Sequence, residues 1–304
     1  MDGPGDPVLE PTPGLRVYDG SPVFIVPVFV LLRWLPGMLR RTLRLTLCVL
    51  AFGVLGACTI ADLRTREVLE VGDRGAAERK GRELLEKAVV AAGGRDRWQS
   101  FSRVEMDFED EWRGFLGWWF RPWPGNPTKL HVRYGLGMGS VQVRFLDGPD
   151  QGSLWGLDQG GFWRTPPKGA RVYQRRESAR FILRAYQFFF ELPFQITKAD
   201  IVLYAGERVR ADRTFDLVFA TWGRETPHAA HDQYLLWIAR DSGLLEMAQY
   251  TIRDRYDFAT GVNRFSDFRR VQGLLLPHAY KMAQDPEDPG FVHRAQLEAV
   301  VFHR

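Results

Sequence analysis

Cysteine is nearly absent from this chain of 304 residues, which has only Cys48 and Cys58. Both lie within or at the end of an apolar segment near the start of the chain, so residues 59–304 contain none. A disulfide framework, a cysteine-based metal site and a cysteine nucleophile are therefore excluded for that part of the chain.

Lysine is also scarce, because arginine supplies 35 of the 41 basic residues. The 37 acidic residues leave a net charge of +4, and acidic residues stand next to basic ones, as in Arg253-Asp254-Arg255. A nucleic-acid-binding surface needs clustered basic residues interleaved with aromatic ones. The charge pattern therefore predicts a chain that does not bind nucleic acid.

Common sequence signatures of catalysis and nucleotide binding are missing as well. There is no Gly-x-Ser-x-Gly elbow, no His-Glu-x-x-His pair and no phosphate loop. The glycine-rich run 135–139 lies between two expected strands rather than before a helix, so it predicts a turn. We expect neither catalysis nor a cofactor.

One pair of histidines deserves a separate interpretation. His228 and His231 stand three residues apart and are followed by Asp232, and such side chains can bind a metal. The spacing alone is common in polar loops, so no metal is expected. A hydrolase or metal-binding protein that uses the His228/His231 loop is the less favoured alternative.

The apolar segment near the start has the three-part plan of a secretory signal over residues 38–57. Three arginines precede an apolar run of about eleven residues, which is too short to span a hydrocarbon core of about 30 Å. The sequence Leu55-Gly56-Ala57-Cys58 resembles the lipobox of bacterial lipoproteins. The resemblance implies acylation of Cys58. Because Thr59 follows instead of aspartate, it also implies a lipid anchor on the periplasmic face of the outer membrane. A buried apolar helix that ends in cysteine is the alternative.

The segments on either side of this signal have simpler interpretations. Residues 1–37 suggest an upstream start chosen in error, with Met38 as the true start, or a real extension in which Val23–Leu35 adds a second membrane contact. Residues 58–75 are polar and of mixed charge, so they predict a tether behind the acylated cysteine. Residues 76–304 are expected to form one folded domain.

The folded domain is predicted to begin with a helix and to continue mainly as strands. Apolar residues recur at helical spacing in Ala76–Ala92, and Gly93-Gly94 supplies a left-handed stop. Most later segments alternate or are bounded by turn residues, which predicts an antiparallel meander rather than a parallel sheet. The expected strands are 103–112, 114–120, 129–134, 140–145, 153–157, 161–164, 201–207, 215–221, 234–239, 244–252, 262–268, 275–282 and 292–302.

A second helix is predicted inside the meander, over Glu177–Phe194. Its apolar residues include Phe181, Phe188 and Phe189 at helical spacing, and Pro193 is expected to stop it. This helix has more apolar surface than one face of a sheet needs. Ordinary core packing and a cover over an apolar cavity are both possible interpretations.

Several phrases of the domain resemble the LolA/LolB-like lipoprotein-carrier superfamily, and within it an uncharacterised branch similar to outer-membrane lipoprotein-sorting proteins. These phrases are Gly93-Gly94 followed by Trp98, Phe190-Glu-Leu-Pro-Phe194, Asp241-Ser-Gly-Leu-Leu-Glu246, Phe265-Ser-Asp-Phe-Arg269 and Gly273-Leu-Leu-Leu-Pro-His278. The resemblance covers roughly residues 78–304. It implies a mainly β (α+β) fold: an incomplete antiparallel β-barrel of about ten or eleven strands, with helices covering an apolar cavity that receives acyl chains.

Aromatic side chains are the candidates for the wall of that cavity, because rings supply a large apolar area at little entropic cost. Plain core packing is the alternative for each of them. The candidates are Trp112, Trp119, Trp155, Trp163, Phe181, Phe188, Phe189 and Trp237.

A membrane contact is predicted in the loop around Trp123. Prolines on both sides of Trp123 break strand pairing, so this tryptophan is expected in a connecting loop. LolB carries a protruding apolar residue on a loop used for membrane transfer, and the loop of Trp123 looks similar. A tryptophan folded back onto the barrel rim is the alternative.

Taken together, the sequence predicts a lipid-anchored periplasmic protein that binds a lipid, a lipoprotein acyl chain or another hydrophobic ligand. Its expected role is transport or maintenance of the cell envelope, without catalysis. A structural or interaction lipoprotein with a fully packed barrel is the main alternative. A large empty apolar cavity favours the first interpretation, whereas a solid core with an exposed apolar patch favours the second.

Overall fold

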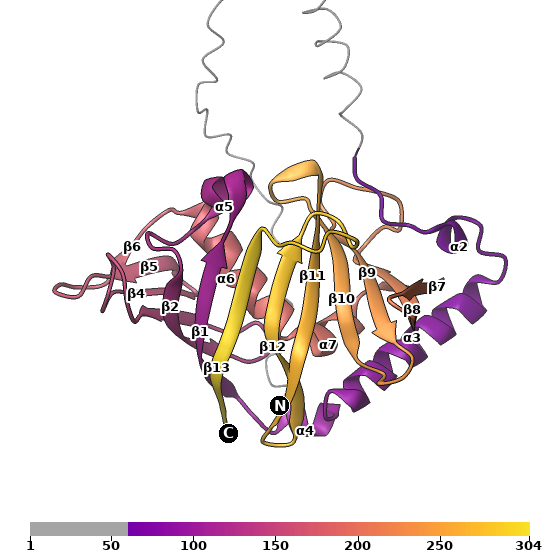
Figure 1. Ribbon diagram of the computed structural model, residues 1–304, viewed down its shortest axis with the longest axis horizontal. Helices are drawn as coiled ribbons and strands as arrows, with labels where there is room; N and C mark the ends of the chain where they lie inside the picture. Colours follow the sequence, from indigo (N-terminus) through magenta and orange to yellow (C-terminus); the bar gives the residue numbers. More distant parts are fainter. Residues whose placement is uncertain (1–59) are drawn as a thin grey trace, which may run out of the picture. The chain divides into compact units, whose positions relative to one another are not determined.

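The computed structural model describes residues 60–304, which form one antiparallel sheet of 13 strands. Its strand order is β6-β5-β4-β3-β2-β1-β13-β12-β11-β10-β9-β8-β7 (Figure 1). The sheet is strongly curved and is not closed into a barrel, since β6 and β7 are its two edges. The expected incomplete barrel is therefore confirmed, with 13 strands instead of about ten or eleven. The extension 1–37, the signal 38–57 and the acylated Cys58 lie outside the described residues and stay predictions.

The strands agree with the expected meander, with one exception and one short addition. Their bounds are β1 Arg103–Trp112, β2 Thr128–Gly135, β3 Val141–Phe145, β4 Leu154–Asp158, β5 Gly161–Thr165, β6 Val172–Tyr173, β7 Ile201–Arg210, β8 Arg213–Thr221, β9 Gln233–Ala239, β10 Leu245–Ile252, β11 Tyr256–Val271, β12 Leu274–Ala283 and β13 His293–His303. Every pairing is antiparallel between neighbours in this order. The two-residue strand β6 was not expected.

Six α-helices and one 3-10 helix complete the described part of the chain. They are α2 Arg66–Leu69, α3 Arg74–Ala91, α4 Arg95–Gln99, α5 Gly114–Phe120, α6 Glu177–Phe190, α7 Leu192–Gln195 and η2 Ile196–Lys198. Helix α3 ends at two glycines with positive φ, as expected from Gly93-Gly94. Within residues 60–304, no helix combines the length and the apolar character needed to cross a bilayer.

The main core lies between the inner face of the sheet and helices α3, α4, α6 and α7. Helix α3 runs along the β7–β9 side, while α6 crosses the inner face of the sheet (Figure 1). The core is rich in aromatic rings. Trp98, for example, stacks on Phe194 with 4.2 Å between ring centroids. The expected helix over 177–194 is therefore α6 followed by α7. Pro193 lies at the start of α7 instead of stopping α6.

One expected strand is a helix. Residues 114–120 form α5, whose backbone bonds are internal or close to its ends, as in Gly117 N to Arg113 O at 3.1 Å. The helix connects the end of β1 to the start of β2, so no neighbouring strand is available for pairing. Gly117 also lies against the backbone of Val292, where a Cβ atom would approach the carbonyl oxygen to 3.0 Å.

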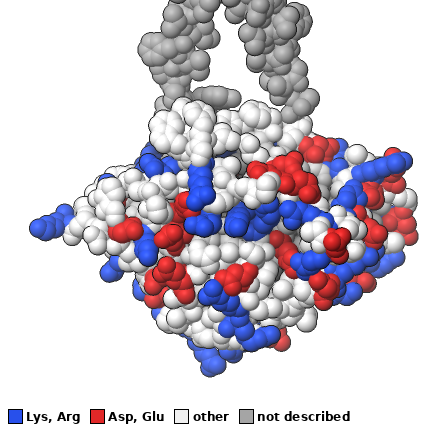
Figure 2. All heavy atoms as spheres, in the orientation of Figure 1, with Lys and Arg blue, Asp and Glu red and all other residues white. Residues whose placement is uncertain are grey.

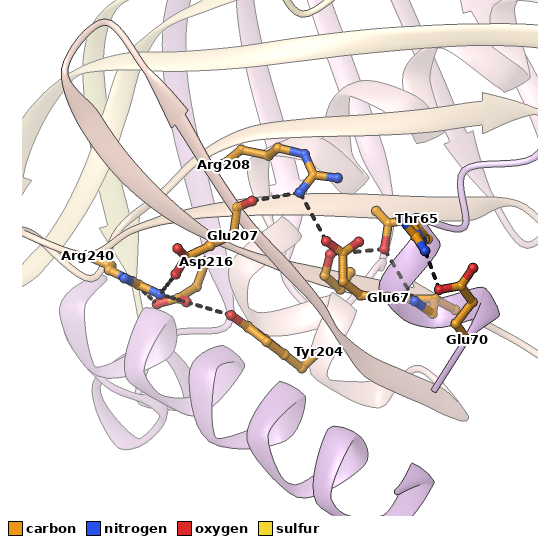
Figure 3. Close-up of polar contacts among 11 residues, drawn as sticks. Thr65, Glu67, Glu70, Tyr204, Glu207, Arg208, Asp216 and Arg240 are labelled. Atoms are coloured by element: carbon orange, nitrogen blue, oxygen red, sulfur yellow. Dashed lines mark hydrogen bonds and ion pairs between the residues drawn. The ribbon is translucent and has the colours of Figure 1, made fainter. Parts of the chain in front are cut away.

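The expected tether is also different, because residues 61–69 are docked on the sheet. The Thr65 hydroxyl donates to Ala205 O at 2.9 Å, and Glu67 of α2 pairs with Arg208 of β7 at 3.2 Å (Figure 3). Leu63 and the buried Val68 pack against a second apolar cluster on the opposite face of β7–β10. The segment is therefore part of the folded unit from Ala61 onward.

Candidate functional site

A small apolar cavity lies between helices α3, α6 and α7 and strands β10–β12. Its volume is about 20 Å³, which is room for about one water molecule. All twelve lining side chains are apolar: Ala88, Ala92, Phe189, Phe190, Pro193, Leu244, Leu245, Phe265, Phe268, Leu275, Leu276 and Pro277. The cavity is therefore suited to hydrocarbon and is much smaller than a hydrocarbon chain.

Helix α6 carries apolar side chains on more than one side. Leu183 and Phe190 are buried against the core, whereas Phe188 and Phe189 are only half-buried. Phe188 contacts Tyr234, and Phe189 contacts Tyr250, with ring centroids 5.4 Å and 4.6 Å apart. On the side that faces β9–β12, α6 is therefore held by contacts between aromatic rings.

Three polar side chains in and just after α6 bind the turn at 135–139. The buried Glu191 carboxylate, just after α6, accepts from Gly137 N at 2.7 Å and Met138 N at 3.2 Å. Arg184 donates to Met138 O at 2.9 Å, and Gln187 donates to Gly135 O at 2.7 Å. These bonds fasten α6 to the turn at 135–139. A buried carboxylate occupies the backbone amides of this turn, so the turn has no free phosphate cradle.

Asp110 forms a second polar cluster on the inner face of β1, where it is fully buried. Its Oδ2 accepts from Trp112 Nε1 and from the Tyr186 hydroxyl, each at 2.8 Å, and also from Trp123 Nε1. Its Oδ1 contacts His293 Nε2. Because Trp112 and Trp123 flank α5 and Tyr186 belongs to α6, one carboxylate ties both helices to the sheet.

Tyrosines line much of the inner face. Burial raises the pKa of Tyr134, Tyr186 and Tyr234 well above that of a free tyrosine, and it also raises the pKa of Tyr250 and Tyr280. These phenols therefore stay neutral at any physiological pH. The buried Tyr280 hydroxyl has no hydrogen-bond partner in the described part of the chain, and its ring contacts Phe265 of the cavity wall.

The predicted cavity residues are scattered, and of these eight candidates only Phe189 lines the cavity. Trp112 and Trp155 are buried in the core or beside it, and Phe181 lies under Arg255. Phe188 packs beside the cavity against Tyr234. The other lining residues were not expected, although all of them except Ala88 and Ala92 belong to phrases that carried the family resemblance.

Three of the candidate tryptophans lie away from the inner face. Trp119 is on α5 and is 63% exposed. Trp163 packs on Gly156 and under Arg171. The residue before it, Phe162, is the one that packs in the main core. Trp237 belongs to the second cluster on the opposite face, where its Nε1 donates to Gln249 at 2.9 Å. Alternation along a strand separates the two faces but does not say which one borders a cavity.

The prediction of an exposed Trp123 is wrong. Trp123 lies in the expected loop after α5, but it is only 2% exposed and its ring packs against Phe145, Trp155 and Tyr186. Its indole N–H is drawn inward by the Asp110 carboxylate. The exposed aromatic residues of this region belong to α5 instead.

The histidine loop offers little for a metal. His228 and His231 pair across a short bridge, with ring centroids 5.4 Å apart, and His228 Nδ1 accepts from Ala230 N at 3.1 Å. Between residues 60 and 304, no three His, Cys, Asp or Glu side chains gather in a way that could hold a metal ion.

Comparisons with known proteins give similar solved structures only. No protein-family model matches the chain, and no curated protein matches it. Three similar solved structures each match 74% of the length of this chain, and the match covers 93% of their own length. They are a LolA superfamily protein from Nitrosomonas europaea (14% identity, TM-score 0.46), an outer membrane lipoprotein-sorting protein domain from Vibrio parahaemolyticus (10%, 0.48) and a DUF1329 family protein from Desulfovibrio piger (15%, 0.46).

The first description names the LolA superfamily, and the second names an outer membrane lipoprotein-sorting domain. At TM-scores of 0.46 to 0.48 these similarities carry no argument about function.

Proposed function

We propose that this chain is a lipid-anchored periplasmic protein that holds an apolar ligand, such as a lipid acyl chain, between α6 and strands β9–β12. The observation that carries the proposal is the half-covered apolar side of α6, which lies beside a cavity lined entirely by apolar side chains. A helix that is apolar on most sides is normally covered, and a bound hydrocarbon would cover this one. The proposal includes no catalysis.

Ligand binding requires this cavity to grow. Its volume of about 20 Å³ compares with about 300 Å³ or more for typical ligand pockets. The hydrogen bonds of α6 in the described chain go to the turn at 135–139, Asp110 and His293, and none goes to β9–β12. A ligand can therefore separate α6 from β9–β12 by displacing apolar contacts, without breaking a buried hydrogen bond. The hydrocarbon of the ligand then replaces the apolar contacts that α6 and the strands lose.

The proposal is tested by mass spectrometry of organic extracts from the full chain purified from cell envelopes. We expect a noncovalently bound phospholipid or fatty acid in a ratio near one to one. Phe268 lines the cavity and is half-buried, so an arginine there can reach solvent while placing a charge at the cavity wall. Phe268→Arg should abolish the co-purifying lipid. The matched control Val209→Arg, at a position 70% exposed on β7, should leave it unchanged.

A second candidate function is a structural or interaction lipoprotein, and the small volume of the cavity favours it. In that case the packed core is the final state, and an outer surface of the domain binds a partner. A purified chain that is free of lipid and does not take up added fatty acid would refute ligand binding and support this alternative. Thermal unfolding of each variant checks that the substitutions leave the fold intact.

A further inference from the structure

Six exposed aromatic residues form one surface, here named the aromatic cap. It consists of Phe115, Trp118, Trp119 and Phe120 of α5 with Tyr256 and Phe258 of β11. Phe115, Trp118 and Trp119 lie three and four residues apart and therefore share one side of α5. Their ring centroids are 6.2 to 6.3 Å apart, and they are 72%, 64% and 63% exposed.

The cap continues from α5 to the hairpin between β10 and β11. The rings of Phe120 and Tyr256 lie 6.4 Å apart, and those of Tyr256 and Phe258 lie 5.6 Å apart. Figure 1 shows α5 and this hairpin at the same end of the sheet. Figure 2 shows that the surface at this end is largely uncharged and is bordered by both basic and acidic side chains. Soluble proteins rarely leave such a patch exposed without a binding role.

The docked segment that begins at Ala61 places the start of the folded unit at the cap. Ala61 N donates to Asp257 O at 2.9 Å, and Asp257 stands between Tyr256 and Phe258. Arg253 also donates to Ala61 O. Three residues span at most about 10 Å, so Cys58 is within about that distance of Ala61. A lipid anchor at Cys58 would therefore hold the cap close to the membrane surface.

The chemistry of the cap also fits a bilayer. Residues 114–120 contain no charged side chain, and Arg113 and Arg121 flank them. Tryptophan rings are favoured at the boundary between headgroups and acyl chains, where neighbouring arginines can reach phosphates. We propose that the aromatic cap is a membrane-docking surface, which inserts its rings into the bilayer interface and fixes the orientation of the domain. This inference concerns an outer surface and does not require a ligand in the cavity.

Bromolipid quenching tests this proposal in the full chain. The protein is purified from membranes with its own N-terminal region and reconstituted in vesicles that contain dibrominated phosphatidylcholine. Trp118 and Trp119 are the exposed tryptophans of the described chain, so they should supply most of the quenched emission. The double variant Trp118→Phe/Trp119→Phe keeps the apolar surface and should lose at least half of the quenching. The control Trp237→Phe, a buried tryptophan of the second cluster on the opposite face of the sheet, should keep it.

Two outcomes would overturn the proposal. One is a wild-type chain whose emission bromolipid does not quench. The other is quenching that the double variant leaves unchanged, since tryptophans elsewhere would then contact the lipid. If light scattering shows dimers that Trp118→Ala/Trp119→Ala converts to monomers, together with no quenching, the cap binds a second copy of the chain instead. Quenching by a brominated lipid inside the cavity can be separated from quenching at the cap by Phe268→Arg. This variant should leave the quenching at the cap intact.

Discussion

Replacing Asp110 by alanine should strongly destabilise the domain. The Asp110 carboxylate is fully buried and is the acceptor for two indole N–H groups and the Tyr186 hydroxyl, while its other oxygen contacts His293. The alanine variant leaves both indoles without an acceptor. Tyr186 keeps one partner, because its hydroxyl lies 2.8 Å from His293 Nε2.

The expected loss follows from this arrangement. Each buried donor left without a partner costs about 1–3 kcal/mol, and removal of one member of a buried charged network costs about 3–5 kcal/mol. We therefore expect Asp110→Ala to lower the free energy of unfolding by about 3–5 kcal/mol, out of a total of about 5–15 kcal/mol for a typical domain. Tyr186→Phe removes one hydroxyl and should cost about 1 kcal/mol.

Urea unfolding at neutral pH, followed by far-ultraviolet circular dichroism, measures these losses. Asp107→Ala is the matched control, because Asp107 lies on the other face of β1 and binds the half-exposed His131 at 2.6 Å. An exposed pair of this kind contributes about 1 kcal/mol or less. If Asp110→Ala costs no more than Asp107→Ala, the argument that Asp110 holds α5 and α6 on the sheet is refuted.

Two further predictions concern packing and pH. Gly81→Ala should destabilise the domain by about 1–3 kcal/mol, because its Cβ would lie 2.9 Å from the backbone of Leu203. The control Gly75→Ala in the same helix has room for the added methyl group, so it should be neutral or stabilising by up to about 1 kcal/mol. Equal shifts of the melting temperature for the two variants would contradict this prediction. A hydrogen bond from Arg240 lowers the pKa of Asp216 in the folded state. The pair therefore stabilises the fold when the pH is above the ordinary aspartate pKa of about 3.9. This stabilisation is lost as the pH falls through the lower pKa of the folded state. Asp216→Asn should therefore be less stable than wild type at neutral pH, and urea titrations should show the difference shrinking in acid; a constant difference would refute the assignment.

The sheet could be predicted from local patterns. In β1, for example, Val104, Met106 and Phe108 alternate with polar residues, and all three are buried. The same alternation places Asp110 inside, which is a readable signal of a buried carboxylate. The sequence did not show what would satisfy it, because Tyr186 and His293 are far away along the chain.

Surface exposure was harder to predict than secondary structure. Prolines correctly placed Trp123 in a loop, but its burial depends on the Asp110 acceptor on another element. Helix α5 looked like a strand because its apolar run is short, and short apolar runs do not distinguish helix from strand. This segment forms a helix because it lies between the ends of β1 and β2, where no free strand is available for pairing. The cavity was hidden because its lining comes from helices and strands that are far apart between residues 88 and 277.

Photoaffinity labelling with a diazirine-bearing fatty acid tests the central claim most directly, because it locates the ligand. The full chain is irradiated with the probe, and the labelled peptides are identified by mass spectrometry. Binding between α6 and β9–β12 predicts labels in residues 177–195 and 233–283, and their loss in Phe268→Arg. Labels confined to the outer face of the sheet, or unchanged by Phe268→Arg, would contradict the proposed binding site.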